Sequence, residues 1–499
     1  MADMPASALA GLLIPKLPMI LKTALLNTLS MSSNSGKWDL RTELTIEILR
    51  SELGKPNPAS ISEQQRNTNK IPEVKGPMWV SKVTIQAPPE DDVRQRLLQA
   101  IDDMKTGVET YTIPPLLPVE GEWHGHRTNA FKDTPEISGL SEEEKYKRLV
   151  AETTSDAVVL FFHGGAYYLM DASSQRPATV RYAKALSGRT FSVRYRLSPQ
   201  NPFPAALLDA LVAYLSLLYP PPGSYHAPVP ASKIILAGDS AGGNLALVLM
   251  QTLLQWHRAA SPSNTPSPSH IPTLSFHGAD VPVPLPGGMA LASPWADLTR
   301  ALPSQRTNAR YDYLPGTEWH AARYPPCPIW PATPPRAHLH ANGEALLHPL
   351  VSPVVPGARW EGCPPVLVQV GQEMMSDESA VLVRRMEKQG VSIRWMQFEA
   401  MPHCFALVME GTEMARCARE AWGEWAREVV GRGEQGRGEK TRTKGEWIAA
   451  KSLAARSVDV RTLTDLSGER AVELMREVQL RLIEECKRDA EKAEQPPVL

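Results

Sequence analysis

Short apolar runs alternate with longer amphipathic stretches through the middle of the chain. The runs at 157–162, 190–196 and 233–237 are apolar or β-branched and predict strands, and the stretch 205–218 between two of them predicts a helix. Strands separated by helices are typical of a parallel sheet. Farther along, the pattern predicts strands at 288–292, 365–370 and 391–398, with a helix at 379–389. The fold class is therefore α/β, with a mostly parallel central sheet flanked by helices.

The first hundred residues differ from this core. Helical patterns span 38–53 and 90–105, a strand is predicted at 78–86, and the polar stretch 60–75 predicts loops. We divide the chain into an N-terminal helical cap at 1–115, an α/β core at 116–430, and a charged linker with a C-terminal helix at 431–499.

Two segments interrupt the core, and one helix follows it. The Ser- and Pro-rich stretch at about 260–286 predicts a flexible surface insertion, and the Pro- and aromatic-rich stretch 311–355 predicts a long ordered connection. The helix at 469–493 carries one apolar stripe, formed by Val472, Met475, Val478, Leu482 and Cys486. That stripe either docks on the core or another subunit, or belongs to a loosely held tail.

Candidate chemistry begins at Ser240, which stands at the centre of Gly238-Asp239-Ser240-Ala241-Gly242, directly after a predicted strand. Small flanking residues permit the tight strand-to-helix turn that exposes a nucleophilic serine. His163-Gly164-Gly165-Ala166 follows an earlier strand, and such a loop can supply backbone N–H groups to a developing oxyanion. Both motifs also occur in ordinary turns, but their order after two strands favours a catalytic site.

A serine hydroxyl needs a base to accept its proton and an acid to orient that base. His403 lies just beyond the last predicted core strand and is the candidate base. Glu373 follows the preceding strand and is the candidate acid, with Asp377 as the alternative. Asp377 begins a helix, where a carboxylate is stabilising without any chemistry. No histidine shows the spacing of a metal site.

These motifs, together with Tyr195-Arg196-Leu197-Ser198-Pro199 and Ser293-Pro294-Trp295, resemble the hormone-sensitive-lipase-like branch of the α/β-hydrolases. More narrowly, the chain is similar to fungal esterases such as steryl acetyl hydrolases and arylacetamide deacetylases. The resemblance implies a serine carboxylesterase without a cofactor, an N-terminal cap over the site, and oxyanion donors at the N–H groups of Gly164, Gly165 and Ala241. It also implies supporting roles for His163 and Asp239. The family commonly has Asp as the acid, and here Glu373 takes that position.

Composition limits the binding partners and the cellular compartment that we expect. The 499 residues carry a net charge of −1, which gives no reason to expect nucleic acid. Five cysteines without suggestive spacing favour a reducing compartment, so we expect an intracellular, cytoplasmic protein. Residues 9–29 are apolar but interrupted by Lys16, Lys22 and two prolines, and they lack the order of a signal peptide. We expect an amphipathic helix pair packed on the core, with weak membrane-interface contact as the alternative.

The predicted function is hydrolysis of short-chain acyl esters, such as acetyl esters, of a hydrophobic alcohol through a Ser-Glu-His triad. One alternative is a non-catalytic small-molecule receptor on a hydrolase scaffold, because fold alone does not determine function. The other is an acyltransferase, in which the acyl group passes to an acceptor other than water. The presence of Ser240, His403 and the Gly-rich loop together favours the hydrolase.

Overall fold

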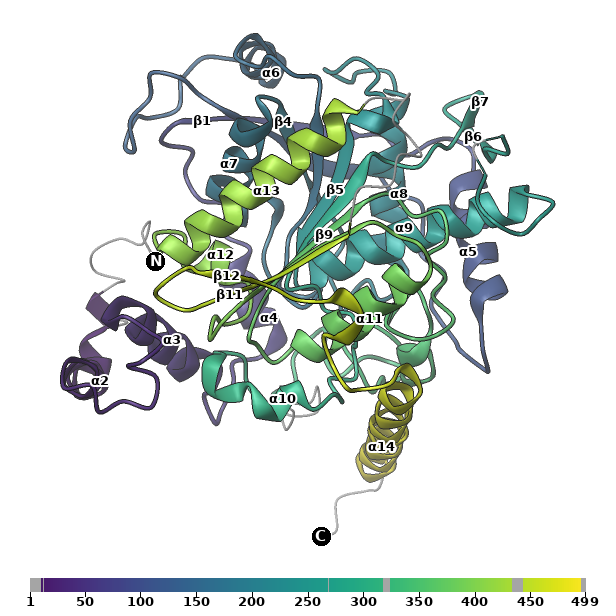
Figure 1. The fold of residues 1–499 in the computed structure, drawn as a ribbon. Helices are drawn as coiled ribbons and strands as arrows, with labels where there is room; N and C mark the ends of the chain where they lie inside the picture. The colour runs from purple at the N-terminus through teal and green to yellow at the C-terminus, as the bar shows by residue number, and fades with distance from the viewer. Residues whose placement is uncertain (1–9, 12, 268, 317–323, 433–442, 495–499) are drawn as a thin grey trace.

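The computed structural model describes all residues except 1–9, 12, 268, 317–323, 433–442 and 495–499. The described residues form a ten-stranded sheet in the order β1-β2-β4-β3-β5-β8-β9-β10-β11-β12. The pairings from β4 through β11 are parallel, whereas β1, β2 and β12 pair antiparallel at the two edges. The predicted fold class, a mostly parallel sheet flanked by helices, is confirmed (Figure 1). The strands of this sheet are β1 (Met78–Ile85), β2 (Val119–His126), β3 (Val158–Phe162), β4 (Arg189–Arg194), β5 (Ile234–Asp239), β8 (Gly288–Ala292), β9 (Val366–Gly371), β10 (Ile393–Phe398), β11 (Lys444–Ile448) and β12 (Ala455–Ser457).

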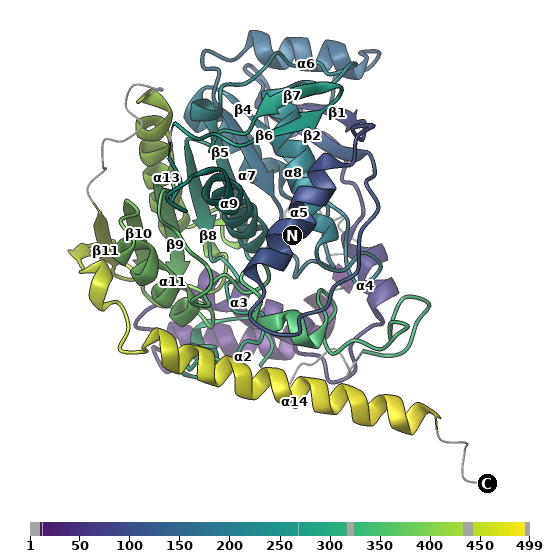
Figure 2. The same cartoon turned by 90° about the vertical axis from the view of Figure 1, so that its right-hand side faces the viewer.

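Helices cover both faces of the sheet. Helices α8 and α9 lie on one face with α11, and α7 and α13 lie on the other (Figure 2). Both faces need cover because consecutive side chains of β3 point to opposite faces. Leu160 belongs to the hydrophobic cluster on the first face and Phe161 to the cluster on the second. Both clusters are buried, as expected for parallel strands that read as continuous apolar runs. The helices of the core are α6 (Glu142–Ala151), α7 (Arg176–Leu186), α8 (Ala205–Leu218), α9 (Ala241–Ala260), α10 (Ser304–Thr307), α11 (Ser376–Lys388), α12 (Phe405–Val408) and α13 (Glu413–Gly431).

The N-terminal segment contributes to several parts of the molecule. Strand β1 is the edge of the central sheet, and α5 (Asp92–Met104) packs against α8 and α9. The stretch 60–75, which we expected to be loops, contains helix α4 (Ile61–Thr68). Its N-cap is Ser60, whose hydroxyl accepts a hydrogen bond from the Glu63 N–H at 3.3 Å. Only Ile61 and Gln65 of α4 are buried, so the helix shows no long apolar period in the sequence.

The first two α-helices form a pair, but only one of them packs on the core. Helix α2 (Leu17–Thr28) lies against α3 (Leu40–Leu53) and contains no buried residue. Helix α3 buries Ile46, and the Trp38 indole N–H just before it donates to the Ala400 carbonyl at 2.7 Å. The helix pair expected to pack on the core was placed within residues 9–29. That stretch holds a 3-10 turn at Ile14–Lys16 and helix α2, neither with a buried residue, so this prediction is wrong; α3, which does pack on the core, lies outside it.

The C-terminal region adds to the sheet. Strand β11 pairs in parallel with β10, and β12 pairs with β11, neither of which the sequence pattern predicted. Most of the expected linker, residues 433–442, lies outside the described residues. Helix α14 (Gly468–Glu494) docks on the core segment around residues 343–347, where Gln479 Nε2 donates to the Gly343 carbonyl at 2.9 Å. Met475 of the predicted stripe is fully buried.

The insertion at 260–286 holds a hairpin of β6 (Thr273–Phe276) and β7 (Ala279–Pro282). Its Leu274 and Phe276 side chains are buried, and the Ser275 N–H donates to Asp92 Oδ2 at 2.8 Å. We expected a flexible surface insertion here. Instead, the hairpin packs against the start of α5.

Candidate active site

A sharp turn joins β5 to α9 and carries Ser240. The Ser240 backbone has φ 52° and ψ −120°, a costly conformation for a residue with a side chain and one that recurs at functional turns. Glycines make the turn feasible, because a Cβ on Gly238 would lie 2.3 Å from the Gly242 carbonyl oxygen. The Ser240 N–H donates to the Ala292 carbonyl at 3.0 Å, which ties the turn to the end of β8. The Gly-x-Ser-x-Gly motif thus forms a strand-to-helix turn.

A carboxylate and an imidazole meet at the same edge of the sheet. Glu373 Oε2 lies 2.7 Å from His403 Nδ1, and both side chains are buried. Glu373 follows β9 and His403 follows β10, which are neighbouring parallel strands, so their carboxyl ends lie side by side. With Nδ1 facing the carboxylate, Nε2 is the ring nitrogen left to exchange a proton with a nucleophile.

The surroundings of His403 tune its proton affinity. Burial of the imidazole lowers its pKa, but the Glu373 carboxylate, with further help from Asp312 and Asp239, more than offsets this effect. The net result is a pKa raised above 6.5, the ordinary value. The carboxylates therefore stabilise the imidazolium that forms when a base accepts a proton.

The loop that carries His403 contacts the serine turn through its next residue. The Cys404 N–H donates to Ser293 Oγ at 3.0 Å, and Cys404 Sγ lies 3.8 Å from Asp239 Oδ2, beside the nucleophile position. Among the described residues, Ser240 Oγ and the His403 ring form no hydrogen bond. Nucleophile and base are often farther apart in a resting site and approach during catalysis.

The two candidate acids occupy different environments. Asp377 Oδ2 accepts a hydrogen bond from the Ser304 N–H at 2.8 Å, and the Asp377 N–H donates to Ser304 Oγ at 3.1 Å. This carboxylate therefore joins α11 to α10 and does not face the imidazole. Of the two candidates, Glu373 is the one placed against His403.

Asp312 is a buried carboxylate that the sequence analysis did not single out. Its Oδ1 accepts from the His403 N–H at 3.3 Å, and its Oδ2 accepts from the Met374 N–H at 2.8 Å. One side chain thus holds the loop of the base and the loop of the acid together. Asp312 lies about 60 residues before Glu373 in a Pro-rich connection, and no local motif marks it.

The Gly-rich loop after β3 is fastened by Asp239. The Gly164 N–H donates to Asp239 Oδ1 at 3.0 Å, and Gln175 Nε2 donates to the same oxygen at 2.9 Å. A Cβ on Gly164 would lie 2.3 Å from Asp239 Oδ2, which explains the glycine. The expectation that the Gly164 N–H faces an oxyanion is therefore corrected, because this donor is already engaged. Within the part of the chain that the structure describes, no carboxylate accepts from the N–H groups of Gly165 and Ala241, and these two groups remain candidate donors.

His163 stabilises the same Gly-rich loop through its ring and its backbone carbonyl. Its ring stacks on Tyr195 with centroids 4.3 Å apart, and the Tyr195 hydroxyl donates to the His163 carbonyl at 2.6 Å. Burial lowers the pKa of His163 to about 4, so the ring is neutral at physiological pH. A neutral, stacked ring is suited to holding the loop rather than to proton transfer.

A small hydrophobic cluster covers the residues that follow this loop. Ile61 of α4 packs there with Tyr168, Trp330 and Leu339, and the partly buried Ala166 lies against them. Gln65 Nε2, also from α4, donates to the Ser198 carbonyl at 2.8 Å. The N-terminal segment and the connection before β9 thus build a wall beside the Gly-rich loop.

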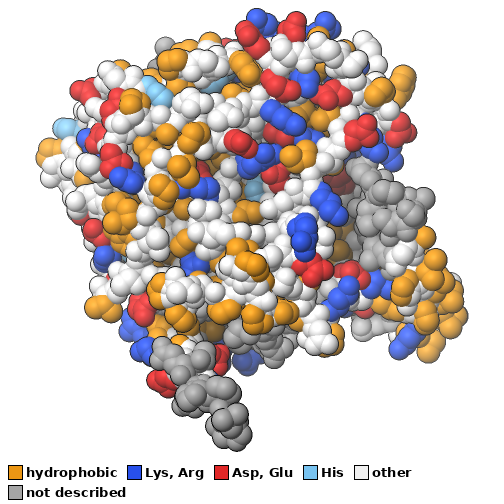
Figure 3. Space-filling model, turned by 180° about the vertical axis from the view of Figure 1, so that it is seen from behind, with side chains coloured by type: hydrophobic (Ala, Val, Ile, Leu, Met, Phe, Trp, Pro, Cys, Tyr) orange, Lys and Arg blue, Asp and Glu red, His pale blue; other side chains and the backbone are white. Residues whose placement is uncertain are grey.

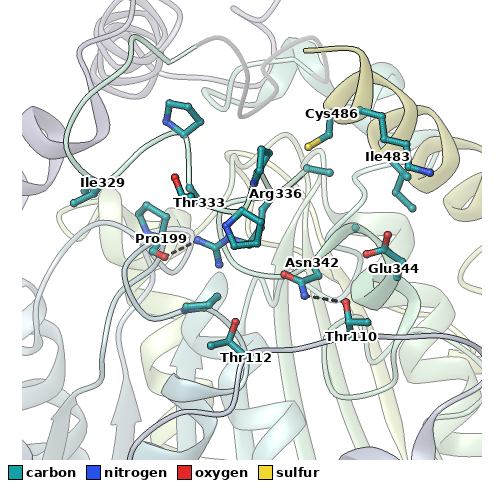
Figure 4. Close-up of a pocket in the computed structure, with 18 of the residues that line it drawn as sticks. Thr110, Thr112, Pro199, Ile329, Thr333, Arg336, Asn342, Glu344, Ile483 and Cys486 are labelled. Carbon is teal, nitrogen blue, oxygen red and sulfur yellow. Dashed lines mark hydrogen bonds between the residues drawn. The ribbon is translucent and has the colours of Figure 1, made fainter. Parts of the chain in front are cut away.

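A separate groove of about 720 Å³ lies between α14 and the Pro-rich connection (Figure 4). Arg336 Nη2 donates to the Pro199 carbonyl at 2.6 Å, and Asn342 Nδ2 donates to Thr110 Oγ1 at 3.0 Å. Ser240, Glu373 and His403 do not line this groove. It is therefore distinct from the candidate active site.

Comparisons with known proteins agree with this fold. The profile of the alpha/beta hydrolase fold matches residues 159–407. An acetyl-hydrolase of Streptomyces hygroscopicus is 30% identical over 279 residues, which cover 55% of this chain and 77% of that protein. Hormone-sensitive lipase of Mus musculus is 36% identical over 98 residues, or 19% of this chain and 12% of that protein. The chain belongs to the α/β-hydrolase fold family.

The fold is also similar to solved structures. An esterase from the bacterial hormone-sensitive lipase family aligns with a TM-score of 0.52 and 22% identity, covering 79% of this chain and 99% of that chain. At this identity the likeness concerns the fold alone. The remaining fifth of this chain has no counterpart in that structure.

Proposed function

We propose that the protein is a serine carboxylesterase in which Ser240 is the nucleophile, His403 the base and Glu373 the acid. The observation that carries this proposal is the 2.7 Å contact between Glu373 Oε2 and His403 Nδ1, next to the strained turn at Ser240. Membership in the α/β-hydrolase family and a relative named acetyl-hydrolase support ester hydrolysis as the reaction.

The first half of the reaction forms an acyl-enzyme. Ser240 Oγ attacks the ester carbonyl carbon while His403 Nε2 accepts the hydroxyl proton. The carbonyl oxygen becomes an oxyanion, which the N–H groups of Gly165 and Ala241 stabilise; loss of one such donor costs about 2.7–4 kcal/mol. The carbon–oxygen bond to the alcohol then breaks, and the alcohol leaves with the proton from His403.

The second half releases the acid. Water gives a proton to His403 and attacks the acyl carbon, and the bond to Ser240 breaks as the serine recovers that proton. Glu373 holds the imidazole in the tautomer with a proton on Nδ1 and stabilises the imidazolium in both halves. Asp239 acts through position, because its carboxylate fastens the Gly-rich loop.

The substrate class is a short-chain acyl ester, such as an acetyl ester, of a hydrophobic alcohol. The apolar wall of Ile61, Tyr168, Trp330 and Leu339 beside the Gly-rich loop supports an apolar group on the substrate. The name of the Streptomyces relative supports an acetyl group. Similarity to steryl acetyl hydrolases and arylacetamide deacetylases stays a prediction, as do the cytoplasmic location and the absence of a cofactor.

A chain-length series of p-nitrophenyl esters tests this function. We expect hydrolysis with a maximum of kcat/KM at acetate or butyrate, and loss of hydrolysis in Ser240→Ala with the fold retained by circular dichroism. Hydrolysis retained in Ser240→Ala would remove Ser240 as the nucleophile. An inactive wild-type protein that binds an ester or alcohol would instead favour the receptor.

A further inference from the structure

Helix α2 presents an exposed ridge of large apolar side chains, which we call the leucine ridge. None of its residues is buried, and the members are 47–68% exposed. The spacing of three and four residues places most of them along one side of the helix. The leucine ridge consists of Ile14, Leu17, Leu21, Leu25, Leu29 and Met31.

The ridge forms a continuous apolar patch at the periphery of the molecule. Figure 3 shows it at the lower right as a group of hydrophobic side chains, and Figure 1 shows α2 at the corresponding edge of the fold. Scattered exposed leucines need no explanation, but a contiguous apolar patch on a protruding helix marks an interaction surface. The ridge projects from one helix and forms no groove. A projecting surface of this kind is better suited to insertion into a fluid lipid layer than to packing against the same ridge of a second copy.

The charges around the ridge favour a phospholipid bilayer as the partner into which it inserts. Residues 10–38 contain Lys16, Lys22 and Lys37 but no Asp or Glu. Lys16 and Lys37 pair with Glu52 and Glu399, whereas Lys22 on α2 is exposed. On this helix, anionic headgroups therefore meet one accessible cation and no carboxylate that would repel them, while the apolar side can lie in the interface.

Length distinguishes lying on a bilayer from crossing it. Helix α2 has 12 residues, fewer than the roughly 20 that a spanning helix needs. None of the helices formed by the described residues is long and apolar enough to cross a membrane. An amphipathic helix of this kind buries only its apolar side, in the plane of the headgroups.

The ridge is mechanically connected to the candidate active site. Helix α2 packs on α3, and Arg50 of α3 donates to the Asp312 carbonyl at 2.7 Å. The Asp312 side chain holds the loops of His403 and Glu373, and Trp38 donates to the Ala400 carbonyl three residues before His403. The ridge and the loops of the catalytic base and acid therefore belong to one packed unit.

We propose that α2 docks this protein on the surface of phospholipid bilayers, with the leucine ridge inserted among the headgroups and acyl chains. Docking sets the catalytic loops at a fixed place relative to the bilayer, where hydrophobic esters accumulate. The docking itself does not depend on the proposed function, and its test has a readout other than hydrolysis.

The test is flotation of the full-length chain with phosphatidylcholine vesicles and with vesicles of phosphatidylcholine and phosphatidylserine. The ridge variant Leu21→Asp with Leu25→Asp is compared with the control Leu480→Asp, because Leu480 on α14 is 58% exposed, against 66% and 60% for the two ridge leucines. We expect wild type and the control to float, with stronger binding to the anionic vesicles, and the ridge variant to bind roughly tenfold or more weakly. Hydrolysis of a water-soluble ester should be the same in all three.

Two results would overturn the proposal. One is a wild-type protein that stays with the aqueous fraction for both vesicle types. The other is a control that loses as much binding as the ridge variant. If light scattering shows a dimer that the ridge variant converts to a monomer, while wild type does not float, the ridge is a self-association surface and the lipid assignment is wrong.

Discussion

Glu373 Oε2 lies 2.7 Å from His403 Nδ1, and both groups are removed from solvent at the carboxyl ends of neighbouring parallel strands. A buried carboxylate at this distance fixes the ring orientation and favours one tautomer. The same contact raises the pKa of His403 in spite of the burial that lowers it. The Glu373–His403 contact therefore affects both the turnover rate and its pH dependence.

Substitution of each candidate acid by its amide distinguishes the roles of Glu373 and Asp377. Glu373→Gln should reduce kcat by about 10⁴-fold, because an amide no longer stabilises the imidazolium or selects its tautomer. Asp377→Asn should leave kcat close to wild type, since that carboxylate only bridges α11 and α10. Steady-state hydrolysis of p-nitrophenyl acetate, with thermal melting as the control for folding, checks this ranking. A larger loss in Asp377→Asn would move the acid to that position.

The pH dependence follows from the direction of the His403 shift. Only the neutral imidazole accepts the serine proton, so the acid limb of kcat/KM should lie above pH 6.5 in wild type. Without the Glu373 carboxylate, burial dominates and lowers the pKa, so the residual activity of Glu373→Gln should keep its acid limb at lower pH.

Asp239 provides the control for this profile, because burial raises its pKa to about 6, within the same pH range. Asp239→Asn removes that titration. The acid limb should persist in this variant if it reports His403. Disappearance of the limb in Asp239→Asn would assign it to Asp239 instead.

The contact between Asp239 and Gly164 predicts a different kinetic effect. Asp239→Ala removes the acceptor of the Gly164 N–H and of Gln175, so the Gly-rich loop should shift. We expect kcat to fall about 10²–10³-fold, as when one oxyanion donor is lost, with little change in KM. Asp239→Asn keeps one acceptor oxygen and should lose less. Equal kcat in wild type and Asp239→Ala would show that the loop is held by other contacts.

Much of the fold could be predicted from local patterns. The apolar runs gave β3, β5 and β8 within a residue or two, and the helix at 205–218 has the predicted bounds. Strand β2 was missed because it carries buried Glu122 and His124. These two side chains hydrogen-bond to each other, and Glu122 also pairs with Arg176 of α7. Its sequence therefore does not resemble a buried strand. Strand β11 was missed for a related reason, since its sequence contains Lys444 and Glu446 and only two of its five residues are buried.

In the candidate site, too, some residues can be predicted from local sequence and others cannot. Ser240, Glu373 and His403 stand next to strand ends in an order that the sequence reveals. Asp312 enters the site through tertiary contacts alone, and the engagement of the Gly164 N–H depends on where the Asp239 carboxylate points. Neither a distant partner nor the direction of a side chain can be inferred from spacing along the chain.

Asp312 accordingly yields a prediction that the sequence could not have suggested. Asp312→Ala leaves the buried N–H groups of Met374 and Tyr313 without their acceptor, and each unsatisfied donor costs about 1–3 kcal/mol. The free energy of unfolding from urea titration should fall, and kcat should fall with it because both catalytic loops lose an anchor. Asp312→Asn keeps one acceptor and should lie between Ala and wild type. Unchanged kcat in a folded Asp312→Ala protein would contradict the anchoring role.

The central claim is that Ser240 Oγ is a nucleophile activated by His403. Reaction with a fluorophosphonate probe, followed by peptide mass spectrometry, measures this directly. We expect one adduct on Ser240 in wild type, no adduct in Ser240→Ala, and labelling slowed by orders of magnitude in His403→Ala. A folded wild-type protein that is not labelled, or is labelled at another residue, would contradict it.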